Sequence, residues 1–190
     1  MWQFFKWDMI AEKLDKVYDL MKDDFGYKNK LAAPTIEKIV VSSGTGKEIK
    51  SDKNRNDFIA DRLAKITGQK PAVRQAKKSI ATFKLREGDP IGLSSTLRGE
   101  VMYSFFDKLV NIAFPRTKDF RGVKNTIIDD MGNATIGIKD NSIFPETGEE
   151  ELRDVFGFAV TIVTTAKSKE EARRFFEIIG IPFAKVVVKK

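Results

Sequence analysis

Cationic side chains gather in the middle of this chain, and the chemistry they suit is phosphate binding. Residues 68–125 hold 12 Lys and Arg against 5 Asp and Glu, and the whole chain has a net charge of +7. Each cation that neutralises a nucleic-acid phosphate releases counterions, which drives binding. A solvated basic surface is the plainer alternative. The clustering favours a nucleic acid without saying which one.

The densest group of cations is predicted to lie on an exposed loop, residues 69–78, which shows little apolar periodicity. Long cationic side chains on a loop can follow a phosphate backbone without reading bases. These cations are Lys70, Arg74, Lys77 and Lys78. Arg98 differs, because a strand would hold its guanidinium as a fixed fork for phosphate oxygens or guanine edges. A cross-strand salt bridge is the competing interpretation of Arg98.

Enzyme chemistry finds little support in the residue types. The chain contains no His and no Cys, which excludes disulfides, thiolate or imidazole metal sites, and catalytic triads built on either residue. Gly44-Thr45-Gly46-Lys47 is an incomplete phosphate loop, because Val41 and Glu48 replace the required glycine and hydroxyl. The glycines instead predict a turn whose backbone donors are open to an RNA phosphate. We expect no enzyme, catalytic residue, metal or cofactor, although carboxylate, lysine or magnesium chemistry stays open.

Helices and strands are expected to position these residues. Apolar periodicity and end signals predict helices at 8–25, 52–67, 99–114 and from Ser168, where a capping box with Glu171 opens the helix. Strands are predicted at 35–43, 79–86, 91–98, 134–138 and 155–165. Since strand side chains alternate between faces, Ser94, Thr96 and Arg98 are expected to form a polar row.

This order of elements predicts an α+β fold with a mainly antiparallel sheet and helices packed on one face, in a single domain over residues 1–190. The second face of the sheet would be a flat polar binding surface. Residues 1–9 are expected to form an N-terminal arm, and residues 186–190 a short C-terminal extension. There is no apolar run of about 18 residues and no signal-peptide pattern, so we expect a cytoplasmic protein without a membrane partner.

An acidic loop is expected over residues 144–151. Its glutamates form a candidate docking patch for a basic protein, because opposite charges steer two surfaces together. Plain solvated surface charge is the alternative. The residues concerned are Glu146, Glu149, Glu150 and Glu151.

Short motifs spread along most of the chain resemble those of one family. They read ITGQKP from Ile66, then AKKSIA, PIG, TLRG, FFDKL, PR with DFRG, GN, IFPE and TTAKS, in the family's order. The similarity extends from about residue 28 to Lys185. The sequence therefore resembles the bacterial form of ribosomal protein five of the large subunit.

The resemblance implies a structural role in the ribosome. Proteins of this family hold 5S ribosomal RNA (rRNA) in the central protuberance, contact peptidyl-site transfer RNA (tRNA) and help form a bridge to the small subunit. The implied partners are 5S rRNA, large-subunit rRNA, peptidyl-site tRNA and neighbouring ribosomal proteins, including a basic small-subunit protein. A free-standing RNA-binding or chaperone-like factor is the alternative function.

Matching positions carry the family's contacts onto this chain. The implied rRNA-binding residues are Ser42, Gln69, Lys70, Thr96 and Arg98. The implied tRNA-binding residues are Arg74, Lys77, Lys78 and Ser79. Residues 143–151 would face the basic small-subunit protein. The family usually has Asn where Ser42 stands, and a hydroxyl offers one donor where an amide offers two, so this contact would be weaker or water-mediated.

Overall fold

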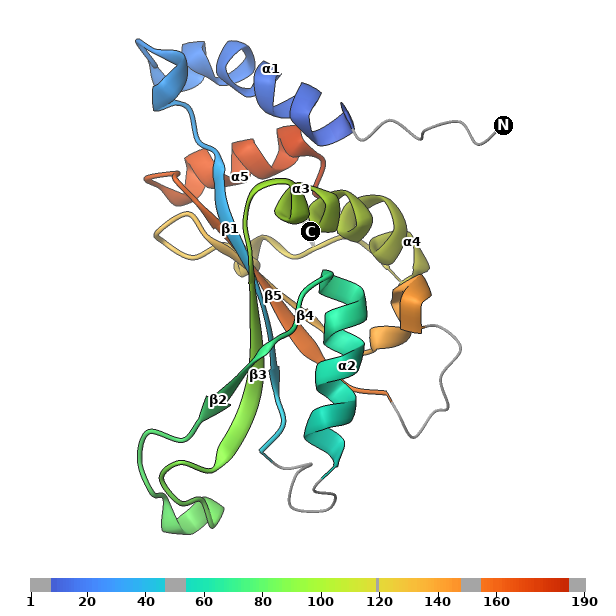
Figure 1. Ribbon diagram of the computed structural model, residues 1–190. Coiled ribbons are helices and arrows are strands. Elements are labelled where there is room, and N and C mark those ends of the chain that lie inside the picture. Colours follow the sequence, from blue (N-terminus) through green and yellow to red (C-terminus); the bar gives the residue numbers. More distant parts are fainter. Residues whose placement is uncertain (1–7, 47–53, 119, 148–154, 185–190) are drawn as a thin grey trace, which may run out of the picture. The chain divides into compact units, whose positions relative to one another are not determined.

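The computed structural model describes residues 8–46, 54–118, 120–147 and 155–184 (Figure 1). Its α-helices are α1 (Asp8–Phe25), α2 (Arg55–Thr67), α3 (Gly99–Lys108), α4 (Phe114–Arg116) and α5 (Lys169–Ile179). Its strands are β1 (Ile36–Gly44), β2 (Ala72–Gln75), β3 (Pro90–Leu97), β4 (Ala134–Ile138) and β5 (Phe158–Thr164). Most of the expected N-terminal arm, residues 1–7, and the C-terminal extension lie outside the described residues.

The described strands form one sheet in the order β2-β3-β1-β5-β4. β2 and β3 are antiparallel. The N–H of Thr165 donates to the carbonyl of Thr35 (3.0 Å), and the hydroxyl of Ser43 donates to the carbonyl of Gly157 (2.8 Å), so β1 and β5 also run in opposite directions. The predicted α+β class with a mainly antiparallel sheet is confirmed.

The chain divides into two compact units, each with its own apolar interior. Unit 1 comprises residues 1–39, 98–136 and 161–190, and unit 2 comprises residues 40–97 and 137–160. Buried side chains of unit 1 include Val17, Met21, Ile36, Phe105, Phe106, Phe175 and Phe176. Those of unit 2 include Val41, Ile59, Leu63, Leu93, Leu97 and Val160. The single domain expected over residues 1–190 stays a prediction.

The N-terminus of α5 in unit 1 is closed by a modified capping box. As predicted, the hydroxyl of Ser168 accepts the N–H of Glu171 (3.3 Å). The Glu171 carboxylate, however, accepts the N–H of Lys167 (2.6 Å) rather than that of Ser168. Its other oxygen accepts the hydroxyl of Tyr27, so the carboxylate also ties the segment after α1 to α5. Burial and this hydrogen bond raise the pKa of Tyr27 above its ordinary value, which keeps the hydroxyl protonated as a donor.

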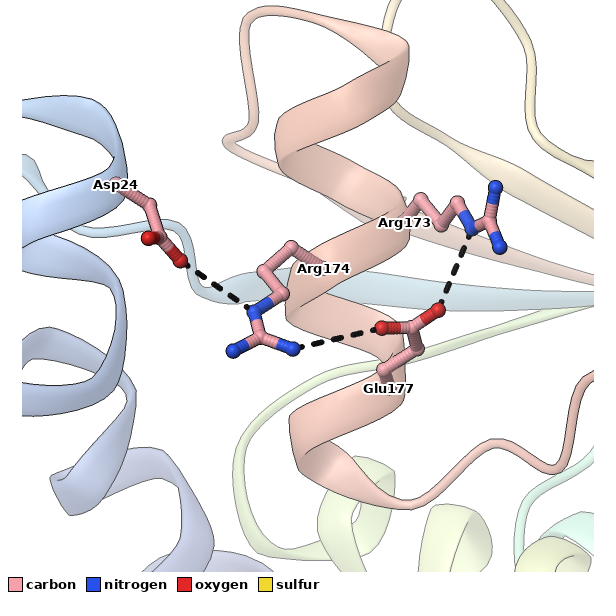
Figure 2. A network of polar contacts seen from close by, with 4 residues as sticks. All are labelled: Asp24, Arg173, Arg174 and Glu177. Atoms are coloured by element: carbon pink, nitrogen blue, oxygen red, sulfur yellow. Dashed lines mark hydrogen bonds and ion pairs between the residues drawn. The ribbon is translucent and has the colours of Figure 1, made fainter.

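Ion pairs on the surface of unit 1 join the same two helices. Figure 2 shows Arg174 of α5 between Asp24 of α1 (3.5 Å) and Glu177 (3.7 Å), with Arg173 on the other side of Glu177 (3.3 Å). These side chains are about half exposed, and exposed pairs contribute at most about 1 kcal/mol each. The buried apolar faces of α1 and α5 therefore do most to hold the helices together.

The helix that follows β3 is longer than the sequence predicts and is widened near its end. The prediction ends it at residue 114, but α3 continues through a π-helical segment, Leu109–Ala113, into α4, which ends at Arg116. Pro115 has no N–H, and its ring crowds the carbonyl four residues earlier. The wider π turn, closed by the N–H of Phe114 donating to the carbonyl of Leu109, accommodates that ring within the helix.

In unit 2, α2 packs its predicted apolar side against β3. Ile59, Leu63 and Ile66 are at most 1% exposed, and Gly68 ends the helix in a left-handed conformation (φ 75°). α2 begins at Arg55, with Asn54 at its N-cap position. Residues 52 and 53, where the sequence predicts the helix to start, lie outside the described residues. None of the helices that the structure describes has both the length and the apolar character to cross a membrane.

The basic region differs from the prediction in two ways. Within the expected loop, residues 69–78, Ala72–Gln75 form strand β2. All four residues are exposed, so no apolar pattern marks the strand; it forms because the edge of β3 offers free backbone partners. The strand expected at 79–86 is wrong: Ala81–Phe83 form a 3-10 turn, and a single bridge joins Ile80 to Leu85. These residues form the tip of a hairpin. No buried core lies beneath them, so their side chains do not alternate between a buried and an exposed face.

Replacing Tyr27 by Phe is expected to destabilise the fold by about 1–3 kcal/mol, because the buried Glu171 carboxylate loses a hydrogen-bond donor. Urea unfolding followed by circular dichroism measures this loss. Tyr18→Phe is the matched control, since Tyr18 is half-buried and its hydroxyl has no partner in the described structure. If both variants unfold at the same urea concentration, the Tyr27 contact is not stabilising.

Candidate nucleic-acid interface

One face of the sheet in unit 2 is lined by small residues, which we call the small-residue face. In β1 and β3 the alternate residues Val41, Ser43, Leu93 and Leu97 are buried on the opposite face. The small-residue face consists of Ser42, Ala72, Gly92, Ser94 and Thr96. Arg74 lies opposite Gly92 in the register between β2 and β3, so its side chain emerges on this same face. Ser42 and Thr96 are partly exposed on this face, whereas Gly92 and Ser94 are buried.

Gly92 sets how closely β1 and β3 approach beneath this face. A Cβ atom at Gly92 would lie 2.9 Å from the carbonyl oxygen of Ser43, closer than real Cβ contacts allow. The carbonyl of Ile91 accepts the N–H groups of both Thr45 (3.0 Å) and Gly46 (3.1 Å). Both N–H groups of the turn after β1 are therefore hydrogen-bonded to β3. The expectation that they are open to a phosphate is wrong.

Gln69 and Thr96 are brought together directly. The side-chain nitrogen of Gln69 donates to the backbone carbonyl of Thr96 (2.8 Å) and to the hydroxyl of Ser95 (3.0 Å). Both amide hydrogens are thus used within the protein. The exposed Gln69 side chain keeps its carbonyl oxygen to accept a hydrogen bond from a ligand, such as a ribose hydroxyl.

The cations of residues 69–78 are exposed, but the structure separates them. Arg74 belongs to β2 and to the small-residue face, whereas Lys77 and Lys78 lie beyond the strand, towards the hairpin tip. Ser79 has a structural contact, because its hydroxyl accepts the N–H of Glu87 (3.0 Å). Lys70 is exposed directly before β2. The four cations therefore do not lie together on one exposed loop, as the sequence predicts.

Arg98, in unit 1, lies just after β3 rather than within it. β3 ends at Leu97, so the predicted polar row loses its third member. Arg98 occupies the N-cap position of α3 with an extended backbone (φ −141°, ψ 162°). Its side chain is exposed, and no carboxylate in the described part of the chain pairs with it. The cross-strand salt bridge considered for Arg98 is therefore not formed there.

The start of the expected acidic loop is well anchored in unit 2. The hydroxyl of Thr147 donates to the carbonyl of Asn141 (2.7 Å), whose own side chain accepts the N–H of Phe156 (3.1 Å). Glu146 is exposed on this segment. Glu149, Glu150 and Glu151 lie outside the described residues.

Comparison with known proteins decides the family. A family model described as ribosomal protein L5 matches residues 29–86, and one described as the C-terminus of the same ribosomal family matches residues 90–183. The large ribosomal subunit protein uL5 of Desulfatibacillum aliphaticivorans is 46% identical over 92% of this chain and 97% of its own length. The proteins of the same name from Thermoanaerobacter sp. (strain X514) and Halothermothrix orenii are also 46% identical, over 93% and 92% of this chain and 98% of their own lengths.

The chain belongs to the ribosomal protein L5 family. It is therefore a structural constituent of the large ribosomal subunit, with rRNA among its partners and the ribosome as its location. The L5 family is a structural family rather than a family of enzymes, in line with the expectation drawn from the residue types. The family resemblance carried by the short motifs is confirmed.

Three apolar side chains on the hairpin of this L5-family chain are not singled out by the sequence. They are Val73 (52% exposed), Ile80 (44%) and Phe83 (61%). Apolar and aromatic residues that alternate with cations are typical of surfaces on which RNA bases stack. That signal is present in the sequence, but the wrongly predicted strand at 79–86 hides it by assigning Ile80 and Phe83 to a sheet.

Gly92→Ala is expected to destabilise the chain by about 1–3 kcal/mol, because the added methyl group must push the β1 backbone away. Gly137→Ala is the matched control: Gly137 also lies in a strand of unit 2, and a Cβ there meets nothing within 4 Å. The control should be neutral or stabilising by up to about 1 kcal/mol. Urea unfolding compares the two, and equal stability of both variants would contradict the close approach at Gly92.

Proposed function

We propose that this chain binds 5S rRNA through Gln69, Thr96 and Arg98. The observation that carries the proposal is the exposed guanidinium of Arg98, which no carboxylate in the described residues neutralises. The backbone of Arg98 is fixed at the start of α3, so the point from which its side chain extends is also fixed. A planar guanidinium can donate two parallel hydrogen bonds to a phosphate or to a guanine edge. The match of these positions to the family motif supports the same assignment.

The small-residue face supports this proposal from unit 2. Gln69 fixes the Thr96 carbonyl and keeps one acceptor, while Ser42 and Thr96 offer hydroxyl groups that both donate and accept. Lys70 adds a cation immediately after Gln69. These groups match the mixture of phosphates and ribose hydroxyls that a structured RNA exposes.

The second proposed contact is with peptidyl-site tRNA, through the tip of the basic hairpin. Lys77 and Lys78 are exposed there, and Ser79 closes the tip by accepting the N–H of Glu87. Arg74 would contribute its charge from β2. Paired strands carry these cations outward from the rest of unit 2 (Figure 1). Such an extension suits contact with a tRNA without disturbing the 5S rRNA site.

The third proposed contact is a bridge to the small subunit through residues 143–151. Four of these residues are glutamates, and a basic partner protein would complement them electrostatically. The proposed setting for all three contacts is the cytoplasmic ribosome. Co-sedimentation of the chain with large subunits would support this, whereas recovery only in ribosome-free fractions would favour the free-standing RNA-binding factor.

Arg98→Ala is expected to weaken 5S rRNA binding by about 1–3 kcal/mol, because a charged hydrogen bond is lost. A filter-binding titration measures the change. Arg98→Lys keeps the charge without the fork and should lose less affinity. Lys28→Ala, which removes another exposed cation of unit 1, should bind as the unchanged protein does. Unaltered affinity of Arg98→Ala would remove Arg98 from the site.

Combining Lys77→Ala with Lys78→Ala is expected to weaken binding of peptidyl-site tRNA to ribosomes that carry the variant. Two phosphate contacts are lost at the hairpin tip, and the 5S rRNA affinity should stay within about two-fold, because those cations lie outside the 5S site. Nitrocellulose retention of labelled tRNA on purified ribosomes measures the first effect. A collapse of 5S rRNA affinity in this double variant would contradict the proposed division between the two sites.

A further inference from the structure

A second group of cations lies in unit 1, after the helix formed by α3 and α4. Arg121 and Lys124 are exposed in residues 120–124, which we call the pinned segment. Neither side chain forms an ion pair within the described residues. Arg116 and Lys118, also exposed and unpaired there, precede the segment in the sequence. None of the contacts assigned above to 5S rRNA, tRNA or a protein uses these four cations.

The backbone of the pinned segment is fixed by the chain near its C-terminus. The N–H of Val123 donates to the carbonyl of Pro182 (2.7 Å), and the N–H of Ala184 donates to the carbonyl of Val123 (2.9 Å). Gly122 has a left-handed backbone (φ 94°), and a Cβ there would lie 2.6 Å from the backbone nitrogen of Ala184. Arg121 and Lys124 are therefore attached to a backbone that cannot shift without breaking these contacts.

An aromatic pair anchors the beginning of the same segment. The ring of Phe120 stacks on that of Phe114 with centroids 5.2 Å apart and planes 10° apart. Phe114 is 3% exposed and Phe120 is half-buried, so the pair attaches the segment to the interior of unit 1. One face of Phe120 is thus already occupied within the protein. The pinned segment offers cations rather than a stacking platform, which favours contact with phosphates over reading of unpaired bases.

A continuous helix separates Arg98 from the residues that lead to the pinned segment. Residues 99–116 are helical, and at 1.5 Å per residue this helix separates Arg98 from Arg116 by about 25 Å. A phosphate bound by Arg98 therefore cannot also reach Arg116, the residue at the end of the helix that leads to the pinned segment. Arg98 and Arg116 therefore lie at opposite ends of one helix and would meet different phosphates.

We infer that the pinned segment is a second RNA site, which binds the phosphate backbone of a base-paired RNA segment through Arg121 and Lys124. The inference rests on the proposed function, in which Arg98 serves 5S rRNA. Base-paired RNA fits because it hides its bases and presents phosphates and ribose hydroxyls, the groups that cations can bind without stacking. Since the backbone is already ordered, binding restricts little beyond the two long side chains.

The test uses the full chain and a fluorescein-labelled RNA duplex of about 20 base pairs, a length that can span a protein's RNA-binding surface. Fluorescence anisotropy measures its affinity over a series of salt concentrations. Arg121→Ala combined with Lys124→Ala should weaken binding about ten-fold or more at low salt, and the slope of log affinity against log salt should become shallower by about 1.5. Swapping the cations, as Arg121→Lys with Lys124→Arg, should restore most of the binding.

Lys16→Ala combined with Lys28→Ala is the matched control, because it removes two exposed cations from elsewhere in unit 1 that form no ion pair with any described residue. If the control weakens duplex binding as much as the test variant, the effect is general electrostatics and the second site is overturned. One equivalent of unlabelled 5S rRNA, enough to fill the Arg98 site, should leave the labelled duplex bound, and full displacement at this ratio would also overturn it. If the unchanged protein binds 5S rRNA and the test variant binds the duplex as tightly as the unchanged protein does, the inference is refuted and the proposed function is not. A chain that binds neither RNA refutes the proposed function as well.

Discussion

The side chain of one glutamine holds the end of β3 in place, and the proposed 5S rRNA contacts depend on it. Gln69 donates both amide hydrogens to β3, at Ser95 and at the Thr96 carbonyl. Because Thr96 is two residues before Arg98, these bonds fix the strand that leads to the exposed guanidinium. Gly92 supports the same strand by allowing β1 to approach it closely. Gln69 and Thr96 are thus both candidate RNA contacts and members of the hydrogen bonds that hold the end of β3.

Placing cations on a fixed backbone explains how a structural protein can hold a flexible polyanion. Counterion release drives association, and it requires only that cations meet phosphates. Rigid attachment adds specificity at each proposed site, because the RNA phosphate must meet a cation that is attached to a fixed backbone position. Arg98 starts a helix, Arg74 lies in a strand, and Arg121 lies in a segment held by the C-terminal part of unit 1. None of these three depends on a loose loop.

The helices α1, α2 and α5 are predictable from the sequence, because the apolar residues that recur at helical spacing are those buried in the structure. Prediction from the sequence fails in the basic hairpin, where β2 has no buried residue and the tip places Ile80 and Phe83 in solvent. Edge pairing depends on a neighbouring strand that is distant in sequence, so no local pattern reveals it. The site residues come from the family motifs. Three features depend on tertiary structure and cannot be predicted from local sequence. They are the hydrogen bonds of Gln69, the N-cap position of Arg98 and the anchoring of residues 120–124.

The central claim is that fixed cations of this chain neutralise phosphates of 5S rRNA. The most direct test is the equilibrium affinity of the purified chain for 5S rRNA as ionic strength is raised. The account predicts a linear fall of log affinity with log salt concentration, with a slope of about −2 or steeper, since at least two or three phosphates must be neutralised. An affinity that does not change with ionic strength, or no binding even in dilute buffer, would contradict it.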